Sequence, residues 1–191
     1  MKSTRFLAAV ATLDLGILAS CAPQPTTQKV QMSSSATRTG GSLSNRIYQE
    51  VNAYRASIGA QPLVRNAGLD RLAQEHCEFL RRHRGTFKLE GSNVSHEGFE
   101  NRTLIAQKFY NFSQIGENVA AAPGGGGNGA PSKLVHMWDA SPSHRFAMRG
   151  NWQETGIGVV VDEDGMVFAT QLFGAGGNSQ MAFAQSFTRS F

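Results

Sequence analysis

The sequence predicts an α+β fold, a three-layer α-β-α sandwich around a central antiparallel sheet. In the stretch ETGIGVVVDEDGMVFATQLFG, Asp164-Gly165 separates two runs rich in β-branched and aromatic residues, and this dipeptide is a strong signal for a tight hairpin. Both faces of the hairpin are partly apolar, so we expect a layer of helices on each side of the sheet. A two-residue turn at Asp164-Gly165 would place Val161 opposite Phe168 and Val159 opposite Thr170.

Upstream of the hairpin, apolar residues recur at helical spacing. A first helix is predicted from Ile47 to Ile58 and is followed by Gly59, which favours a stop. Asn66 is a candidate N-cap for a second helix, whose apolar stripe runs beside His76. We interpret His76 as a core residue rather than a site residue. The stripe consists of Leu69, Leu72, Ala73 and Leu80.

Cys77, which follows His76, is interpreted as a small buried hydrophobe. A short helix is predicted to begin near Phe99 or Arg102, and SQIGENVAAA is predicted to be a short extended or bent segment. The glycine loop PGGGGNGAP lacks the GK[ST] end of a phosphate loop, so we interpret it as a linker.

The next helix is predicted to stop within the stretch HMWDASPSHR. Pro131 suits its first turn, and Trp138 belongs to its buried face. Pro142 disfavours helical geometry at Ser141, so the helix ends or kinks there. His144 then lies at the start of a new turn.

The first 21 residues are predicted to be an export signal. Two basic residues, Lys2 and Arg5, precede an apolar run that ends in Leu18-Ala19-Ser20-Cys21. This ending resembles the bacterial lipobox, which implies cleavage before Cys21 and acylation of its thiol. The alternative is an ordinary signal peptide cut nearby. We expect residues 22–43 to be a flexible tether, residues 44–174 to be the folded domain and residues 175–191 to be a tail.

The composition fits one globular domain rather than a disordered chain. The 191 residues are 40% hydrophobic and 17% charged, with a net charge of +4. No run of basic residues alternates with aromatic residues, so nucleic acid is not an expected partner. Only two cysteines are present. If Cys21 carries a lipid, Cys77 has no partner for a disulfide.

Three polar residues are left over from the packing pattern, namely His96, Glu117 and His144. Two histidines and a carboxylate could share a divalent metal such as zinc with open coordination positions. They could instead form a proton-transfer pair in which Glu117 orients one ring. Since spacing alone does not show that they meet, separate capping roles stay open as well.

The motifs SHEGF…R, GENVA, WDASPSHR and GIGVVV…FATQLFG occur in the order seen in bacterial members of the CAP superfamily. These are the SCP-like proteins related to cysteine-rich secretory, antigen-5 and pathogenesis-related-1 proteins. The resemblance covers about residues 44–174 and implies an α-β-α sandwich with a large cleft that holds two histidines and acidic residues. It assigns His96, Glu117 and His144 to that cleft, as catalytic residues if the protein is an enzyme, with the two histidines as candidate metal ligands.

The sequence departs from many eukaryotic CAP proteins in two respects. Ser141 occupies the position of a second glutamate, and the disulfides of those relatives are absent. No Gly-x-Ser-x-Gly elbow is present, so Ser141 and Ser143 are not expected to act as nucleophiles.

The function expected is non-enzymatic binding of a small, lipid-like ligand or a protein partner in a cleft that includes His96, Glu117, Ser141 and His144. The alternative is a metal-dependent hydrolase or peptidase that uses the same cleft. No cofactor is certain, and zinc is the metal considered. The expected location is the bacterial cell envelope, through a lipid on Cys21, or the medium if the signal is an ordinary one.

Overall fold

The computed structural model describes residues 34–86, 95–124 and 127–176, with side chains from residue 40 onward. The predicted signal segment, Cys21 and the residues of the tail beyond 176 lie outside the described residues. Within this part of the chain, no helix is both long enough and apolar enough to cross a bilayer.

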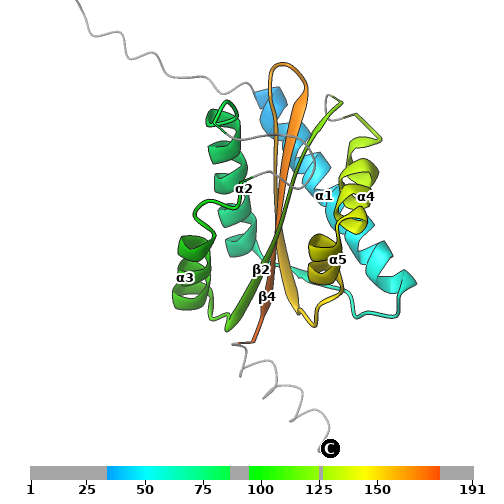
Figure 1. Ribbon diagram of the computed structural model, residues 1–191, viewed down its shortest axis with the longest axis vertical. Helices are drawn as coiled ribbons and strands as arrows, with labels where there is room; N and C mark the ends of the chain where they lie inside the picture. Colours follow the sequence, from blue (N-terminus) through cyan, green and yellow to red (C-terminus); the bar gives the residue numbers. More distant parts are fainter. Residues whose placement is uncertain (1–33, 87–94, 125–126, 177–191) are drawn as a thin grey trace, which may run out of the picture. The chain divides into compact units, whose positions relative to one another are not determined.

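The described residues form a four-stranded sheet between two layers of helices, as predicted (Figure 1). One layer consists of α2 (Ala67–Arg82) and α3 (Phe99–Tyr110), and the other of α1 (Ser34–Ser57), α4 (Ala130–Ala140) and α5 (Pro142–Arg149). The strands are β1 (Val64–Arg65), β2 (Gln114–Pro123), β3 (Glu154–Val161) and β4 (Met166–Ala175), in the spatial order β1-β3-β4-β2.

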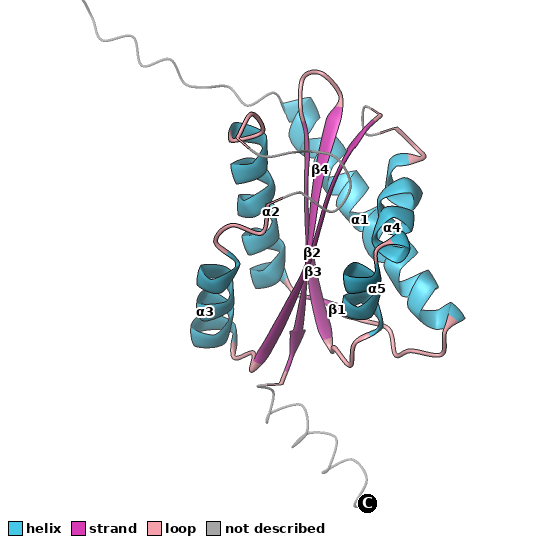
Figure 2. Ribbon diagram, viewed as in Figure 1, coloured by secondary structure: helices cyan, strands magenta, loops and turns pink. Residues whose placement is uncertain are grey.

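The sheet is antiparallel except at one edge. The strands β2, β4 and β3 pair in antiparallel fashion, whereas the two-residue β1 pairs in parallel with β3. The prediction of an α-β-α sandwich is therefore confirmed, with a mixed sheet in place of a purely antiparallel one. The segment expected to be short and either extended or bent is extended: it forms the ten-residue strand β2 at the other edge (Figure 2).

Helix α1 begins earlier than the predicted domain boundary at residue 44. It starts at Ser34, so the last ten residues of the expected tether are helical. Leu43 extends the apolar stripe of this helix into the core. A methyl group on Gly40 would lie 2.9 Å from the carbonyl oxygen of Val159, so the helix approaches β3 closely at this turn.

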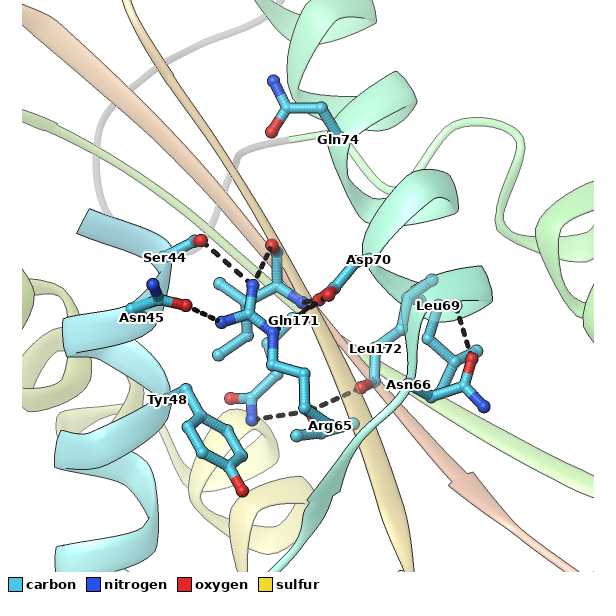
Figure 3. A network of polar contacts seen from close by, with 12 residues as sticks. Ser44, Asn45, Tyr48, Arg65, Asn66, Leu69, Asp70, Gln74, Gln171 and Leu172 are labelled. Carbon is cyan, nitrogen blue, oxygen red and sulfur yellow. Dashed lines mark hydrogen bonds and ion pairs between the residues drawn. The ribbon is translucent and has the colours of Figure 1, made fainter. Parts of the chain in front are cut away.

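An ion-pair network joins the helix layers around the β1 edge of the sheet (Figure 3). The guanidinium of Arg65 donates from Nε to Asp70 at 2.8 Å and from Nη1 to Asn45 at 2.7 Å. Asp70 Oδ1 also accepts the backbone N–H of Ile157 at 2.8 Å. These contacts connect α1, β1, α2 and β3 at the edge opposite β2.

The predicted hairpin between β3 and β4 is present. The predicted two-residue turn is wrong, because the loop has three residues, and the pairing of the two strands is shifted by one residue as a result. Val161 lies opposite Val167 rather than Phe168. The N–H of Asp162 donates to the carbonyl oxygen of Met166, so three residues form the loop between them. The N–H of Gly165 donates to the carbonyl oxygen of Asp162, and Gly165 has φ +82°. This is the type I turn followed by a left-handed glycine. The slip moves Phe168 and Thr170 to the face covered by α2.

Replacing Gly165 with valine is expected to lower the free energy of unfolding by about 1–3 kcal/mol, because a β-branched residue resists a positive φ. Thermal unfolding of the wild type and the variant measures this loss. Gly129→Val is the matched control, because Gly129 has φ −85° and no neighbour within 4 Å of an added Cβ. An unchanged midpoint for Gly165→Val would contradict a strained turn here.

Candidate functional site

The residues predicted to form the site gather around the edge strand β2. Its residues Val119 and Ala121 pack in the cluster beneath α2, whereas Ala120 and Ala122 pack beneath α1 and α4. Because side chains alternate along a strand, Glu117 points toward the α2 and α3 side. Its side chain is only 1% exposed.

The carboxylate of Glu117 is fully engaged by its neighbours. Arg102 of α3 donates from Nε to Oε2 at 2.8 Å and from Nη2 to Oε1 at 2.8 Å. His96 Nδ1 lies 2.8 Å from Oε1. A two-pronged arginine contact of this kind is a strong, oriented interaction. Each oxygen of Glu117 therefore accepts at least one hydrogen bond, and the carboxylate is held in one orientation.

Arg102 also fixes the loop that carries His96. Its Nη1 donates to the carbonyl oxygen of Glu97 at 2.9 Å, and its side chain is 10% exposed. Since an ionised carboxylate only accepts, the hydrogen of the His96–Glu117 bond belongs to Nδ1 of the imidazole. The other ring nitrogen, Nε2, is left for a ligand, and the side chain of His96 is 44% exposed.

His144 comes from the opposite side of β2. As predicted, α4 ends at Ala140, Ser141 is extended with ψ 124°, and Pro142 opens α5. Asn118 of β2 donates from Nδ2 to the carbonyl oxygen of His144 at 3.1 Å and so anchors the first turn of α5. The His144 and His96 ring centroids lie 6.2 Å apart. The structure thus brings His96, Glu117 and His144 together.

The surroundings of His144 favour the neutral form of its ring. The residue is buried, and burial, followed by the repulsion from His96, lowers the pKa of His144. The hydroxyls of Ser141 and Ser143 lie 3.2 Å from each other.

A cavity of about 350 Å³ lies beside His144, between the β2 edge and the α4–α5 break. Neighbouring residues of β2 point to opposite faces of the sheet, so the presence of both Val119 and Ala120 in the lining places the cavity against the strand edge. Trp138 is fully buried at this site. Six of the eight lining residues are apolar. The lining consists of Val119, Ala120, Met137, Trp138, Ala140, Ser141, Pro142 and His144.

His76 belongs to the same polar cluster, which the sequence did not indicate. Its ring is fully buried, with Nδ1 3.1 Å from Thr170 Oγ1 and 3.7 Å from Glu117 Oε2. Burial, and then the charges of Arg102 and His96, lower the pKa of His76 to about 3. The ring is therefore neutral at ordinary pH, and its contact with Glu117 is not an ion pair.

Cys77 is buried, as expected. Burial raises the pKa of its thiol to about 12, so the thiolate form is negligible at neutral pH.

The donor set does not match a catalytic zinc site. Such sites use three protein ligands with an open fourth position. The described residues contain no group of three or more His, Cys, Asp or Glu side chains placed to hold a metal. The two imidazoles of His96 and His144 are the candidate metal ligands that the structure brings close to each other.

Comparison with known proteins places the chain in a family. Residues 48–173 match the CAP, or cysteine-rich secretory protein, family. No curated protein matches the chain. Similar solved structures include an outer surface protein of Borrelia burgdorferi, with 20% identity, a TM-score of 0.56 and coverage of 70% of this chain and 92% of that one.

Two further solved structures show the same fold within longer chains. A cysteine-rich secretory protein of Staphylococcus aureus has 17% identity and a TM-score of 0.53, and covers 71% of this chain but only 38% of its own. An extracellular protein of Bacillus anthracis that contains an SCP domain has 19% identity and a TM-score of 0.52, with coverages of 72% and 42%. The family match extends over most of the chain, and these folds agree with it, so the chain belongs to the CAP family of cysteine-rich secretory proteins.

Proposed function

We propose that this CAP domain binds a small, lipid-like ligand in the cavity beside His144 and does not catalyse a reaction there. The observation that carries the proposal is the state of Glu117. A hydrolase would use this carboxylate as a base or a metal ligand, whereas here Arg102 and His96 already donate hydrogen bonds to both of its oxygens and favour a structural role.

The cavity supports a ligand that is mainly apolar. Its volume of about 350 Å³ lies within the range of roughly 300–1,000 Å³ that is usual for small-molecule sites. Trp138 and Met137 provide apolar walls, while His144 and Ser141 provide polar groups at the same site. An apolar body with one polar end, such as a medium-length fatty acid, fits this division.

Replacing Ala140 with tryptophan is expected to weaken binding of dodecanoic acid at least tenfold. Ala140 is exposed, lies in the last turn of α4 and lines the cavity, so a large ring there would fill the space without disturbing the core. Isothermal titration calorimetry measures the affinity. The matched control is Ala56→Trp, an exposed alanine of α1 outside the cavity. Equal affinities for both variants, or no binding by the wild type, would contradict the proposal.

The second candidate function is a metal-dependent hydrolase or peptidase, which depends on zinc binding. The observation in its favour is the 6.2 Å between the His96 and His144 ring centroids. Two imidazoles bound to one zinc through nitrogens at about 2.0–2.1 Å have centroids roughly 5–6 Å apart.

With only two protein ligands, zinc is expected to bind weakly, and binding should be lost in His96→Ala and His144→Ala. Calorimetry with zinc on the wild type and both variants measures this. Affinity should fall as pH falls, because the ring must be neutral to bind zinc, and the lowered pKa of His144 delays its protonation to a pH below the ordinary histidine value. If the wild type gives no heat, or if all three proteins give equal heats, zinc does not bind at these histidines. The proposal of a metal-dependent hydrolase would then be contradicted as well.

We further propose that the protein is exported and held at the cell envelope by a lipid on Cys21. Support comes from the apolar run before Leu18-Ala19-Ser20-Cys21 and from the surface or extracellular descriptions of the three similar bacterial proteins. Mass spectrometry of the mature N-terminus tests the anchor. An unacylated chain that begins elsewhere would contradict it.

A further inference from the structure

We infer that Met137 is an oxidation site that regulates ligand binding in the cavity beside His144. A peroxide converts its thioether to a sulfoxide, and the sulfoxide lowers the affinity of the cavity for an apolar ligand. This inference rests on the proposed function and deepens it, because it places the same ligand site under the control of an oxidant.

Met137 belongs to the wall of α4 that faces the cavity. Ala140 and Ser141 follow it at helical spacing, so the three side chains share one side of the helix. All three line the cavity. Met137 has the longest side chain of the three, is half-buried and packs against the core cluster that contains Trp138. An apolar ligand in the cavity would therefore lie against the thioether of Met137.

The other sulfur-containing residues of the described part are not placed to have this effect. Cys77 and Met148 are fully buried, and burial raises the pKa of the Cys77 thiol to about 12, which makes the reactive thiolate negligible. Met166 is half-buried like Met137, but it lies on β4 and does not line the cavity. Among the described residues, Met137 is thus the one sulfur-containing side chain that is partly exposed and lines the cavity.

The reaction is the transfer of one oxygen atom from hydrogen peroxide to the sulfur. A lone pair of Met137 Sδ forms the bond to oxygen, the O–O bond of the peroxide breaks, and water leaves. The sulfur is oxidised and the peroxide is reduced. A flexible apolar side chain becomes a polar, chiral one, and methionine sulfoxide reductases reverse the change.

A sulfoxide in this wall opposes ligand binding because the cavity is mainly apolar. Six of the eight lining residues are apolar. In the free protein the half-buried side chain leaves the sulfoxide oxygen in contact with water. An alkyl chain that covers this oxygen removes the water and supplies no hydrogen bond. Burying a polar group in this way costs free energy, so we expect the affinity for dodecanoic acid to fall about tenfold.

Peroxide treatment of the full chain tests the inference. Catalase removes the excess peroxide, and peptide mass spectrometry measures the sulfoxide at positions 137, 148 and 166. We expect sulfoxide at 137 and 166, whereas the buried Met148 stays unmodified. Isothermal titration calorimetry should show that the wild type loses about tenfold in affinity for dodecanoic acid after treatment. Methionine sulfoxide reductases with dithiothreitol should restore the affinity.

Two leucine variants assign the effect to its position. Met137→Leu has no sulfur at the cavity, so its affinity should be the same before and after peroxide treatment. Met166→Leu is the matched control, because Met166 is also half-buried but lies outside the cavity. This variant should lose affinity on treatment as the wild type does. Bound dodecanoic acid should slow oxidation at position 137 and leave the rate at position 166 unchanged.

A loss of affinity in treated Met137→Leu as large as that in the treated wild type would overturn the inference. So would an unchanged affinity of wild type that is fully oxidised at position 137, or resistance of this position to peroxide. If the untreated wild type does not bind dodecanoic acid, the proposed ligand site fails and its regulation fails with it. The first three outcomes contradict the oxidation site alone, so the two failures are distinguishable.

Discussion

Replacing Arg102 with methionine is expected to lower the free energy of unfolding by about 3–5 kcal/mol, because it leaves a buried carboxylate without its counter-charge. The side chains of Glu117 and Arg102 are 1% and 10% exposed, and three Arg102–Glu117 contacts lie at 2.7–2.8 Å. Water therefore has little access to replace the guanidinium. Chemical unfolding monitored by circular dichroism measures the loss.

The double variant Arg102→Met, Glu117→Gln separates the charge from the packing. A glutamine at 117 has the same size and still offers an oxygen to His96, but it carries no charge to leave unpaired. We expect this variant to recover most of the lost stability. If it is as unstable as Arg102→Met alone, the loss comes from the packing of the arginine stem against α3 and β2, and the charge argument fails.

Local rules were sufficient wherever one residue decides the backbone. Asn66 caps α2 by accepting the N–H groups of Gly68 and Leu69, as its position before an apolar stripe predicts. Pro142 ends α4 and places His144 in the first turn of α5. These features depend on short-range sterics and hydrogen bonds, which the sequence contains in full.

The hairpin register was beyond those rules. Asp164-Gly165 suits a two-residue turn, but a glycine with positive φ also completes the three-residue loop that the chain adopts. The choice depends on which face of β4 packs under α2. Phe168 fills that layer together with Cys77 and Leu80, and this is tertiary information.

The site was only partly predictable for the same reason. The residues alone left His96, Glu117 and His144 as three separated polar groups, and only the family resemblance indicated that they meet. Arg102 was placed on a helix without a partner, and His76 was set aside as a core residue. His76 is in the core, yet it lies 3.7 Å from Glu117. The packing of α2 and α3 against β2 places His76 both in the core and next to Glu117, and the sequence does not contain this information.

Acidification is expected to destabilise the domain through His76. Burial, Arg102 and His96 lower the pKa of this residue from 6.5 to about 3 in the folded state. Its Nδ1 faces Thr170 and Glu117, and its Nε2 has no hydrogen-bond partner among the described residues. A proton held on this ring in the folded chain would therefore be buried close to Arg102 and His96, the two groups whose charges lower its pKa.

The sign of the effect follows from proton binding. Between pH 6.5 and about 3, the unfolded chain binds a proton at His76 that the folded chain does not, so stability falls as pH falls through this window. Above pH 6.5 the contribution is constant. The loss attributable to His76 should be about 2 kcal/mol at pH 5 and approach about 5 kcal/mol near pH 3.

The variant His76→Leu tests this contribution, because it keeps a similar volume and cannot bind a proton. Chemical unfolding at pH 7 and pH 5 should show a decrease in stability that is about 2 kcal/mol smaller for His76→Leu than for the wild type. His136→Leu is the control, since His136 is an exposed histidine of α4, and it should keep the wild-type decrease. His144, whose pKa is lowered by burial and by His96, adds a loss in the same direction in all three proteins. An equal decrease in the wild type and in His76→Leu would show that folding does not lower the pKa of His76. The conclusion that this ring is neutral in the folded protein would then be contradicted.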